Sequence, residues 1–149
     1  MILDAQLQFS SAQALTATAN STNLIDLGIG VQNLTTNLFD GEPMAVFLQV
    51  GVAADHTTGD ETYAVAIQCD DNTAFSSATA LVSQTILFSA LTAGAVVVVP
   101  IPVGVAVERY LGLRYTLGGT TPSVTLSAYL QPLSMINKYK QYADNITIS

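Results

Sequence analysis

Basic residues are the scarcest feature of this sequence. It contains only four, Arg109, Arg114, Lys138 and Lys140, against eleven aspartates and glutamates, and its formal net charge is −7. A nucleic-acid-binding surface needs clustered lysines and arginines to neutralise phosphates, and attraction to an anionic membrane surface depends on a similar cluster. The sequence therefore predicts that neither nucleic acid nor a membrane is a partner.

Residues that carry catalytic chemistry are also scarce. The sequence has one cysteine, Cys69, so it cannot form an intramolecular disulfide. Its one histidine, His56, lies in the acidic loop at residues 55–61, but no second His or Cys lies near it to complete a metal site. We found no nucleophile motif of the Gly-x-Ser-x-Gly type. The sequence therefore predicts no catalytic residue, no metal, no cofactor and no enzymatic activity, and leaves open whether this loop binds an ion or a glycan.

Charged residues of both signs make up only 10% of the sequence, whereas half of it is hydrophobic. Soluble domains carry about 25% charged residues. A surface with few ions loses little hydration when a partner covers it, which favours an interaction protein. A sandwich rich in Thr and Ser would give a similar composition, so composition alone leaves both interpretations open.

No apolar stretch is long enough for a membrane helix. The longest, residues 93–107, is shorter than the roughly 18 apolar residues that such a helix needs, and Pro100 and Pro102 interrupt it. It is better explained by a buried strand followed by a bend. Residues 1–4 lack the basic and apolar regions of a secretory signal, so we do not expect one.

Short β-type runs separated by turn residues dominate what remains. Residues 109–117 alternate strictly, with Leu111, Leu113 and Tyr115 on one side, and Gly118-Gly119 after them predicts a hairpin loop. The other predicted strands are residues 44–52, 63–69, 80–88, 95–101 and 123–130, with shorter candidates at 5–9 and 24–27. This spacing predicts one all-β domain, an antiparallel β-sandwich or jelly roll.

The same patterns predict the core. The continuous valines of residues 95–101 indicate a strand buried on both faces. Asp70-Asp71-Asn72 predicts a turn held by side-chain hydrogen bonds. The residues expected to be buried are Val46, Leu48, Val65, Ile67, Val97, Val99, Leu113 and Val124.

The composition changes after Pro132. We therefore place the domain at residues 1–132 and an extended C-terminal tail at 133–149, which holds half of the basic residues. Lys138 and Lys140 alternate, so both would face one side of an extended chain. The predicted partner-binding residues are Lys138, Tyr139, Lys140 and Tyr142, which would contact a neighbouring subunit. The alternative interpretation is a frayed terminus.

Three segments together form a recognisable pattern. They are an early strand pair, MILDAQLQFSSAQALTATANSTNLIDLG; a strand with an acidic turn and a Phe-Ser-Ser-Ala step, YAVAIQCDDNTAFSSATAL; and a strand, Gly-Gly turn and strand, RYLGLRYTLGGTTPSVTLSAYL. Together they resemble the capsid cement (decoration) proteins of tailed bacteriophages, in particular the jelly-roll type of a Bordetella podophage. The likeness covers most of the first 130 residues and does not extend to the tail.

The resemblance implies a structural protein on the outer surface of the virion head, made in the host cytoplasm. It also implies a homo-dimer or homo-trimer at capsid symmetry axes that clamps neighbouring major capsid protein subunits, without catalytic residues. The alternative is a carbohydrate-binding sandwich or virion adhesin, in which exposed Tyr63, Tyr110 and Tyr129 would replace the tryptophan that the sequence lacks. A small hydrolase is the third class, and a pair of acids in a cleft would reveal it.

Overall fold

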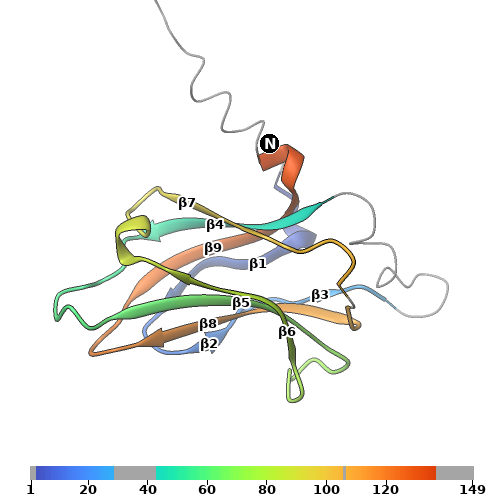
Figure 1. Cartoon of the computed structure of the whole chain (residues 1–149), viewed down its shortest axis with the longest axis horizontal. Helices are drawn as coiled ribbons and strands as arrows, with labels where there is room; N and C mark the ends of the chain where they lie inside the picture. The colour runs from blue at the N-terminus through green and yellow to red at the C-terminus, as the bar shows by residue number, and fades with distance from the viewer. Residues whose placement is uncertain (1–2, 29–42, 106, 137–149) are drawn as a thin grey trace, which may run out of the picture.

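The computed structural model describes residues 3–28, 43–105 and 107–136. These residues form two antiparallel sheets that pack face to face (Figure 1). The β4 sheet has the order β1 (Gln8–Leu15), β9 (Val124–Pro132), β4 (Met44–Val52) and β7 (Val96–Pro100). The β5 sheet has the order β2 (Ala19–Asn20), β8 (Tyr110–Gly118), β5 (Thr62–Asp70) and β6 (Thr79–Ile86), and β3 (Ile25–Asp26) also pairs with β8.

The strand order is that of a jelly roll. The chain passes repeatedly from one sheet to the other, and strands distant in sequence become neighbours, as β1 and β9 do. The predicted all-β sandwich is therefore confirmed. The predicted hairpin at Gly118-Gly119 is wrong, because β8 and β9 belong to different sheets and residues 119–123 cross between them.

Alternation along each strand places one face in the core. On β8, Leu111, Leu113 and Tyr115 are buried, while Arg114 and Thr116 on the opposite face are exposed. On β4, Val46, Leu48 and Val50 point between the sheets and join the same core. The predicted strand at residues 44–52 matches β4 residue for residue.

Seven of the eight predicted core residues are buried, with Val97 as the exception. Val97 is half-buried and packs at the margin of the core. The reason is that β7 is at the edge of its sheet, where β4 is its one neighbour among the described strands. The prediction that residues 95–101 are buried on both faces holds in part: Ala95 and Val97 pack on the main core and Val96 and Val98 on the opposite face, but residues 95–98 are half-buried. The buried seven are Val46, Leu48, Val65, Ile67, Val99, Leu113 and Val124.

A second apolar cluster covers the outer face of the β4 sheet. Ala45 and Phe47 of β4 are buried there together with Ile136. Residues 133–136 are helical, and the Leu133 N–H donates to the Pro43 carbonyl over 2.9 Å. The expectation of an extended tail from residue 133 is therefore wrong for these four residues, because an apolar face was available for them to cover.

Two smaller differences concern the N-terminal strand and the cysteine. Residues Ala5–Leu7 form a 3-10 turn, η1, in which the Asp4 side chain accepts from the Gln6 N–H, so the short strand expected at 5–9 begins only at Gln8. Cys69 is fully buried, and burial raises the pKa of its thiol. In the part of the chain that the structure describes, no helix has the length and apolar character to cross a membrane.

Candidate functional site

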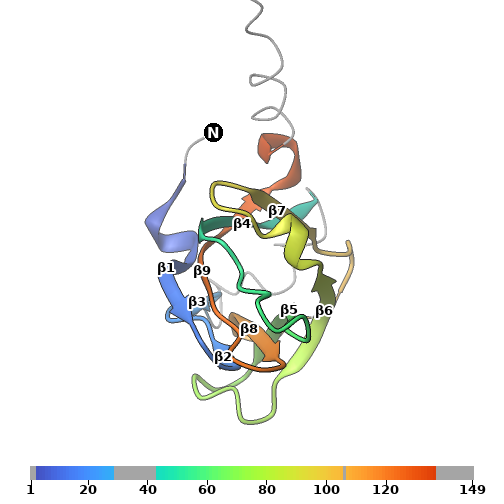
Figure 2. The same ribbon diagram turned by 90° about the vertical axis from the view of Figure 1, so that its left-hand side faces the viewer.

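Three connections meet at one end of the sandwich, which we call the tip. They are residues 53–61 between β4 and β5, residues 87–95 between β6 and β7, and residues 119–123 between β8 and β9 (Figure 1). The Ala54 N–H donates to the Leu91 carbonyl over 2.9 Å, and the Asp55 N–H donates to the Ser123 carbonyl over 2.8 Å. Figure 2 views the sandwich from this end. Backbone hydrogen bonds thus tie the first connection to both others.

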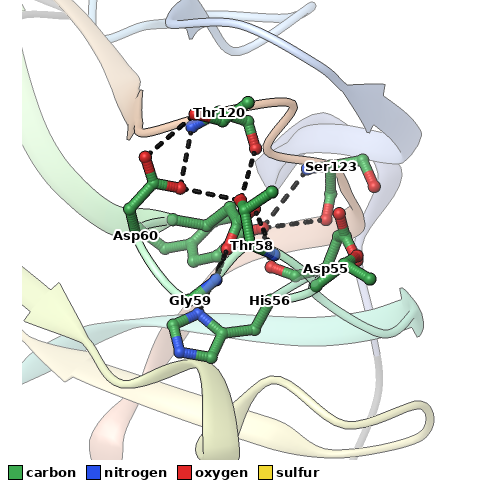
Figure 3. Close-up of polar contacts among 10 residues, drawn as sticks. Asp55, His56, Thr58, Gly59, Asp60, Thr120 and Ser123 are labelled. Carbon is green, nitrogen blue, oxygen red and sulfur yellow. Dashed lines mark hydrogen bonds and ion pairs between the residues drawn. The ribbon is translucent and has the colours of Figure 1, made fainter.

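Asp60 fastens the loop of residues 53–61 to the β8–β9 connection. Its carboxylate accepts from the Thr120 N–H over 3.0 Å and from the Thr120 hydroxyl over 2.9 Å (Figure 3). These bonds and one from the Thr58 hydroxyl lower the pKa of Asp60. Gly119 lies directly against this loop, so that an added Cβ would meet the Asp60 carbonyl oxygen at 2.4 Å. Only glycine fits there, and it also has a φ of +90°.

Glu61 is buried within the same loop. Its carboxylate accepts from the Thr58 hydroxyl, from the Thr58 N–H over 3.3 Å and from the Gly59 N–H over 3.1 Å. The Thr58 hydroxyl bond is the largest influence, and together these bonds lower the pKa of Glu61 despite its burial. Among the described residues, no lysine or arginine pairs with this buried carboxylate.

His56 joins this carboxylate to an aromatic ring. The imidazole stacks on Phe88 with ring centroids 3.8 Å apart and an interplanar angle of 14°. His56 Nδ1 lies 3.4 Å from Glu61 Oε2 and makes no hydrogen bond within the described structure. Figure 3 shows the imidazole pointing away from the Asp60–Thr120 contact. The stack forms a flat wall beside the buried acid.

A groove of about 290 Å³ opens beside this wall, and we call it the tip groove. Its buried floor includes Tyr63 and Ile86, whereas Leu87 and Phe88 on its rim are 73% and 43% exposed. Leu87 and Phe88 are neighbours in sequence, so their exposed apolar area is adjacent to the groove and could be buried by a partner. The described residues that line it are His56, Glu61, Thr62, Tyr63, Thr85, Ile86, Leu87 and Phe88.

The tyrosines do not form the sugar-binding platform expected for the carbohydrate alternative. Tyr63 is only 3% exposed, and its hydroxyl donates to the Asp55 carbonyl over 2.6 Å. Its prediction as an exposed residue is therefore wrong, because its ring belongs to the core and its hydroxyl braces the tip loop. Tyr110 and Tyr129 are half-buried. Among the described residues, no group of three His, Cys, Asp or Glu side chains could hold a metal ion.

The structure does not test the partner-binding residues predicted from the sequence. Lys138, Tyr139, Lys140 and Tyr142 fall outside the described residues. Sequence reasoning singled out the acidic loop at 55–61 but missed the tip groove. Its signal was present in Leu87-Phe88, an apolar pair directly after a strand, yet nothing in the sequence indicated that this pair lies beside His56.

The architecture places the chain in the class of all-β jelly rolls. A comparison with protein families then identifies it further: the model of the Bbp16 family matches residues 9–130, so the chain belongs to the Bbp16 family. The name of that family suggests a Bordetella phage protein. No curated protein matches the chain.

Proposed function

We propose that this protein is a capsid decoration protein that binds the outer surface of a phage head. It would clamp neighbouring major capsid protein subunits, associate with itself as a dimer or trimer, and have no enzymatic activity. The observation that carries this proposal is the match of residues 9–130 to the Bbp16 family. Synthesis in the host cytoplasm and residence in the virion follow from the same proposal.

The composition and the tip support an interaction role. Only 10% of the residues are charged, so covering the surface costs little hydration of ions. The exposed Leu87 and Phe88 supply apolar area that a partner could bury. Many copies on one shell would act together, so each contact could be modest and still hold adjacent subunits against the outward pressure of packaged DNA.

The test compares expanded head shells with free capsid subunits. The shells would be assembled from the major capsid protein encoded in the same phage genome as this chain. We expect the purified protein to sediment with shells and not with free subunits, because a site that spans two subunits exists only after assembly. DNA-filled heads that carry the protein should release DNA at a higher temperature than heads that lack it.

Equal release temperatures, together with failure of the protein to sediment with bare shells, would contradict the proposal. Binding to a glycan array in place of shells would favour the carbohydrate-binding alternative. The tip groove, with its aromatic wall of His56 and Phe88, is then where a sugar ring would stack.

A further inference from the structure

The tip groove places exposed apolar side chains beside an acidic loop. Leu87 and Phe88 form its rim, the buried Glu61 belongs to its lining, and Asp55 and Asp60 lie in the same loop outside the lining. No lysine or arginine pairs with these carboxylates among the described residues. A complementary partner would present an aromatic or apolar side chain beside a cation.

The described cations of the chain are engaged elsewhere. Arg109 forms a bidentate contact with Asp26, with both distances 2.9 Å, and lies over the Tyr110 ring. Arg114 donates to the Asn20 side chain over 3.1 Å. The remaining two basic residues are Lys138 and Lys140, which alternate with tyrosines in the sequence KYKQY of residues 138–142. This segment has the chemistry that the tip groove lacks.

Geometry decides which copy of the chain supplies the two lysines. Ile136 is fixed against Ala45 and Phe47 on the outer face of the β4 sheet. An extended chain spans no more than about 3.6 Å per residue, so the Cα atoms of Lys138 and Lys140 can lie at most about 7 and 14 Å from that of Ile136. From Phe47 the tip lies five residues further along β4, roughly 17 Å, and the groove then lies in the other sheet, about 10 Å across the sandwich. The path around the sheet edge exceeds this reach.

We propose that the tip groove of one copy binds residues 137–149 of a second copy, with Lys138 and Lys140 beside the acidic loop of residues 55–61 and a tyrosine ring against Leu87 and Phe88. This inference rests on the self-association that the proposed function includes, and it names the surface responsible. Reciprocal exchange between two copies would close a two-fold dimer, whereas one-way exchange would close a ring.

Two variants of the full chain test the exchange. The tail variant carries Lys138→Glu and Lys140→Glu, and the tip variant carries Leu87→Lys, which places a cation on the groove rim. We expect each to self-associate at least about tenfold more weakly than the natural chain in sedimentation velocity measurements over a range of concentrations, equivalent to about 1.4 kcal/mol. Val103→Lys is the matched control, since Val103 is 56% exposed but lies away from the tip groove, and it should associate like the natural chain.

Mixing the two variants distinguishes exchange between copies from any other effect. The tail variant keeps an intact tip and the tip variant keeps an intact tail, so the mixture should form hetero-oligomers although neither variant alone associates well. A fluorescent peptide with the sequence of residues 137–149 should bind the tail variant and bind the tip variant at least about tenfold more weakly. The same peptide with both lysines changed to glutamine should also bind the tail variant more weakly.

Self-association of the tail variant at natural strength would overturn the inference, as would a mixture that stays unassociated or a peptide that binds both variants equally. Circular dichroism melting of each variant checks that it remains folded. The outcome is separable from the proposed function, because sedimentation with shells uses the natural chain. A chain that binds shells but fails these tests would retain the proposed function and lose the exchange.

Discussion

At both ends of the sandwich a buried carboxylate holds a loop in place, yet the two ends expose different side chains. At the far end, where β5 finishes, Asp70 is fully buried and accepts from the Ser77 N–H over 2.8 Å and from the Ser77 hydroxyl over 2.9 Å. At the tip, Glu61 is buried and accepts from Thr58 and Gly59. In both places a carboxylate organises a loop by satisfying donors that the loop would otherwise bury unpaired.

At each end, a neighbouring segment packs so closely against a glycine that a Cβ atom would not fit. An added Cβ on Gly112 would meet the Phe75 ring at 2.7 Å at the far end, and on Gly119 it would meet the Asp60 carbonyl oxygen at 2.4 Å at the tip. The difference lies in what is left exposed. The loop of residues 71–78 leaves no large apolar side chain in solvent, whereas the tip exposes Leu87 and Phe88. The connection between β7 and β8 at the far end exposes Val103, but the tip places two exposed apolar side chains next to each other beside a groove, where a partner could bury them together.

Substitution of the two glycines should have the largest effect on stability. We expect Gly119→Ala to lower the free energy of unfolding by about 2–4 kcal/mol, because it combines a positive φ with a clash against backbone. Gly112→Ala should cost about 1–3 kcal/mol, since the Phe75 ring can shift. Gly104→Ala is the control: its φ is +81° but its Cβ would meet nothing, so about 1 kcal/mol is expected. Urea unfolding measures all three, and equal costs at Gly104 and Gly119 would show that the close approach at the tip is unimportant.

Low pH should reduce the stability that the buried carboxylates at both ends give to the fold. Burial raises the pKa of Asp70, but the bonds from Ser77, Asp71 and Asn72 outweigh burial and hold the pKa below its usual value, as the Thr58 and Gly59 bonds do for Glu61. A lowered folded pKa stabilises the fold above the unfolded pKa of about 4, and this contribution is lost as the pH falls through the folded pKa. Thermal midpoints should therefore decline below about pH 4.5.

The variants Asp70→Asn and Glu61→Gln separate the contributions of the two ends to this decline. Each should have a lower midpoint at pH 7 and a shallower decline on the acid side than the natural chain. Asp26→Asn adds a third case at the far end, because hydrogen bonds from Arg109 and the Gly28 N–H lower the pKa of Asp26 to about 2. Its contribution should disappear between about pH 4 and pH 2. If the thermal midpoint of all three variants declines with falling pH as steeply as that of the natural chain, this account is contradicted.

The smallest effect on stability is expected at Leu87. Leu87→Ser and Val103→Ser both alter side chains that are more than half exposed, so each should change the free energy of unfolding by no more than about 0.5 kcal/mol. Only Leu87→Ser should weaken self-association, because only Leu87 lines the tip groove. A large loss of stability in Leu87→Ser would mean that this exposed side chain stabilises the fold and is not simply a surface for a partner.

The sequence predicted most of the strands because the alternation of apolar and polar residues lies within each strand. The run of residues 44–52 and the alternation of β8 were sufficient to place both elements and their inward faces. The partner of a strand is not local information. Gly118-Gly119 indicated that β8 ends there, yet it could not indicate that the next strand lies in the other sheet, and so the hairpin prediction was wrong. Val97 failed for a related reason, since its exposure depends on the edge position of β7.

The tip groove could be predicted even less, because its lining comes from separate connections. His56 attracted notice as the single histidine, and its stacking on Phe88 depends on how residues 53–61 and 87–95 fold back over the same end. Phe88 itself was expected within a strand, but it begins the 3-10 turn η3 (Phe88–Ala90). Sites built from segments that are distant in sequence become visible only when topology brings the segments together.

The burial of Cys69 makes this chain convenient for distance measurements. It is the only cysteine, it is fully enclosed by the core, and burial suppresses its ionisation to the reactive thiolate. A cysteine introduced at an exposed position, such as Thr57 in the tip loop, would therefore be the sole accessible thiol and could be labelled selectively without removing the natural one. Spin or fluorescent labels placed in this way could report directly how far apart two tips lie in an assembled particle.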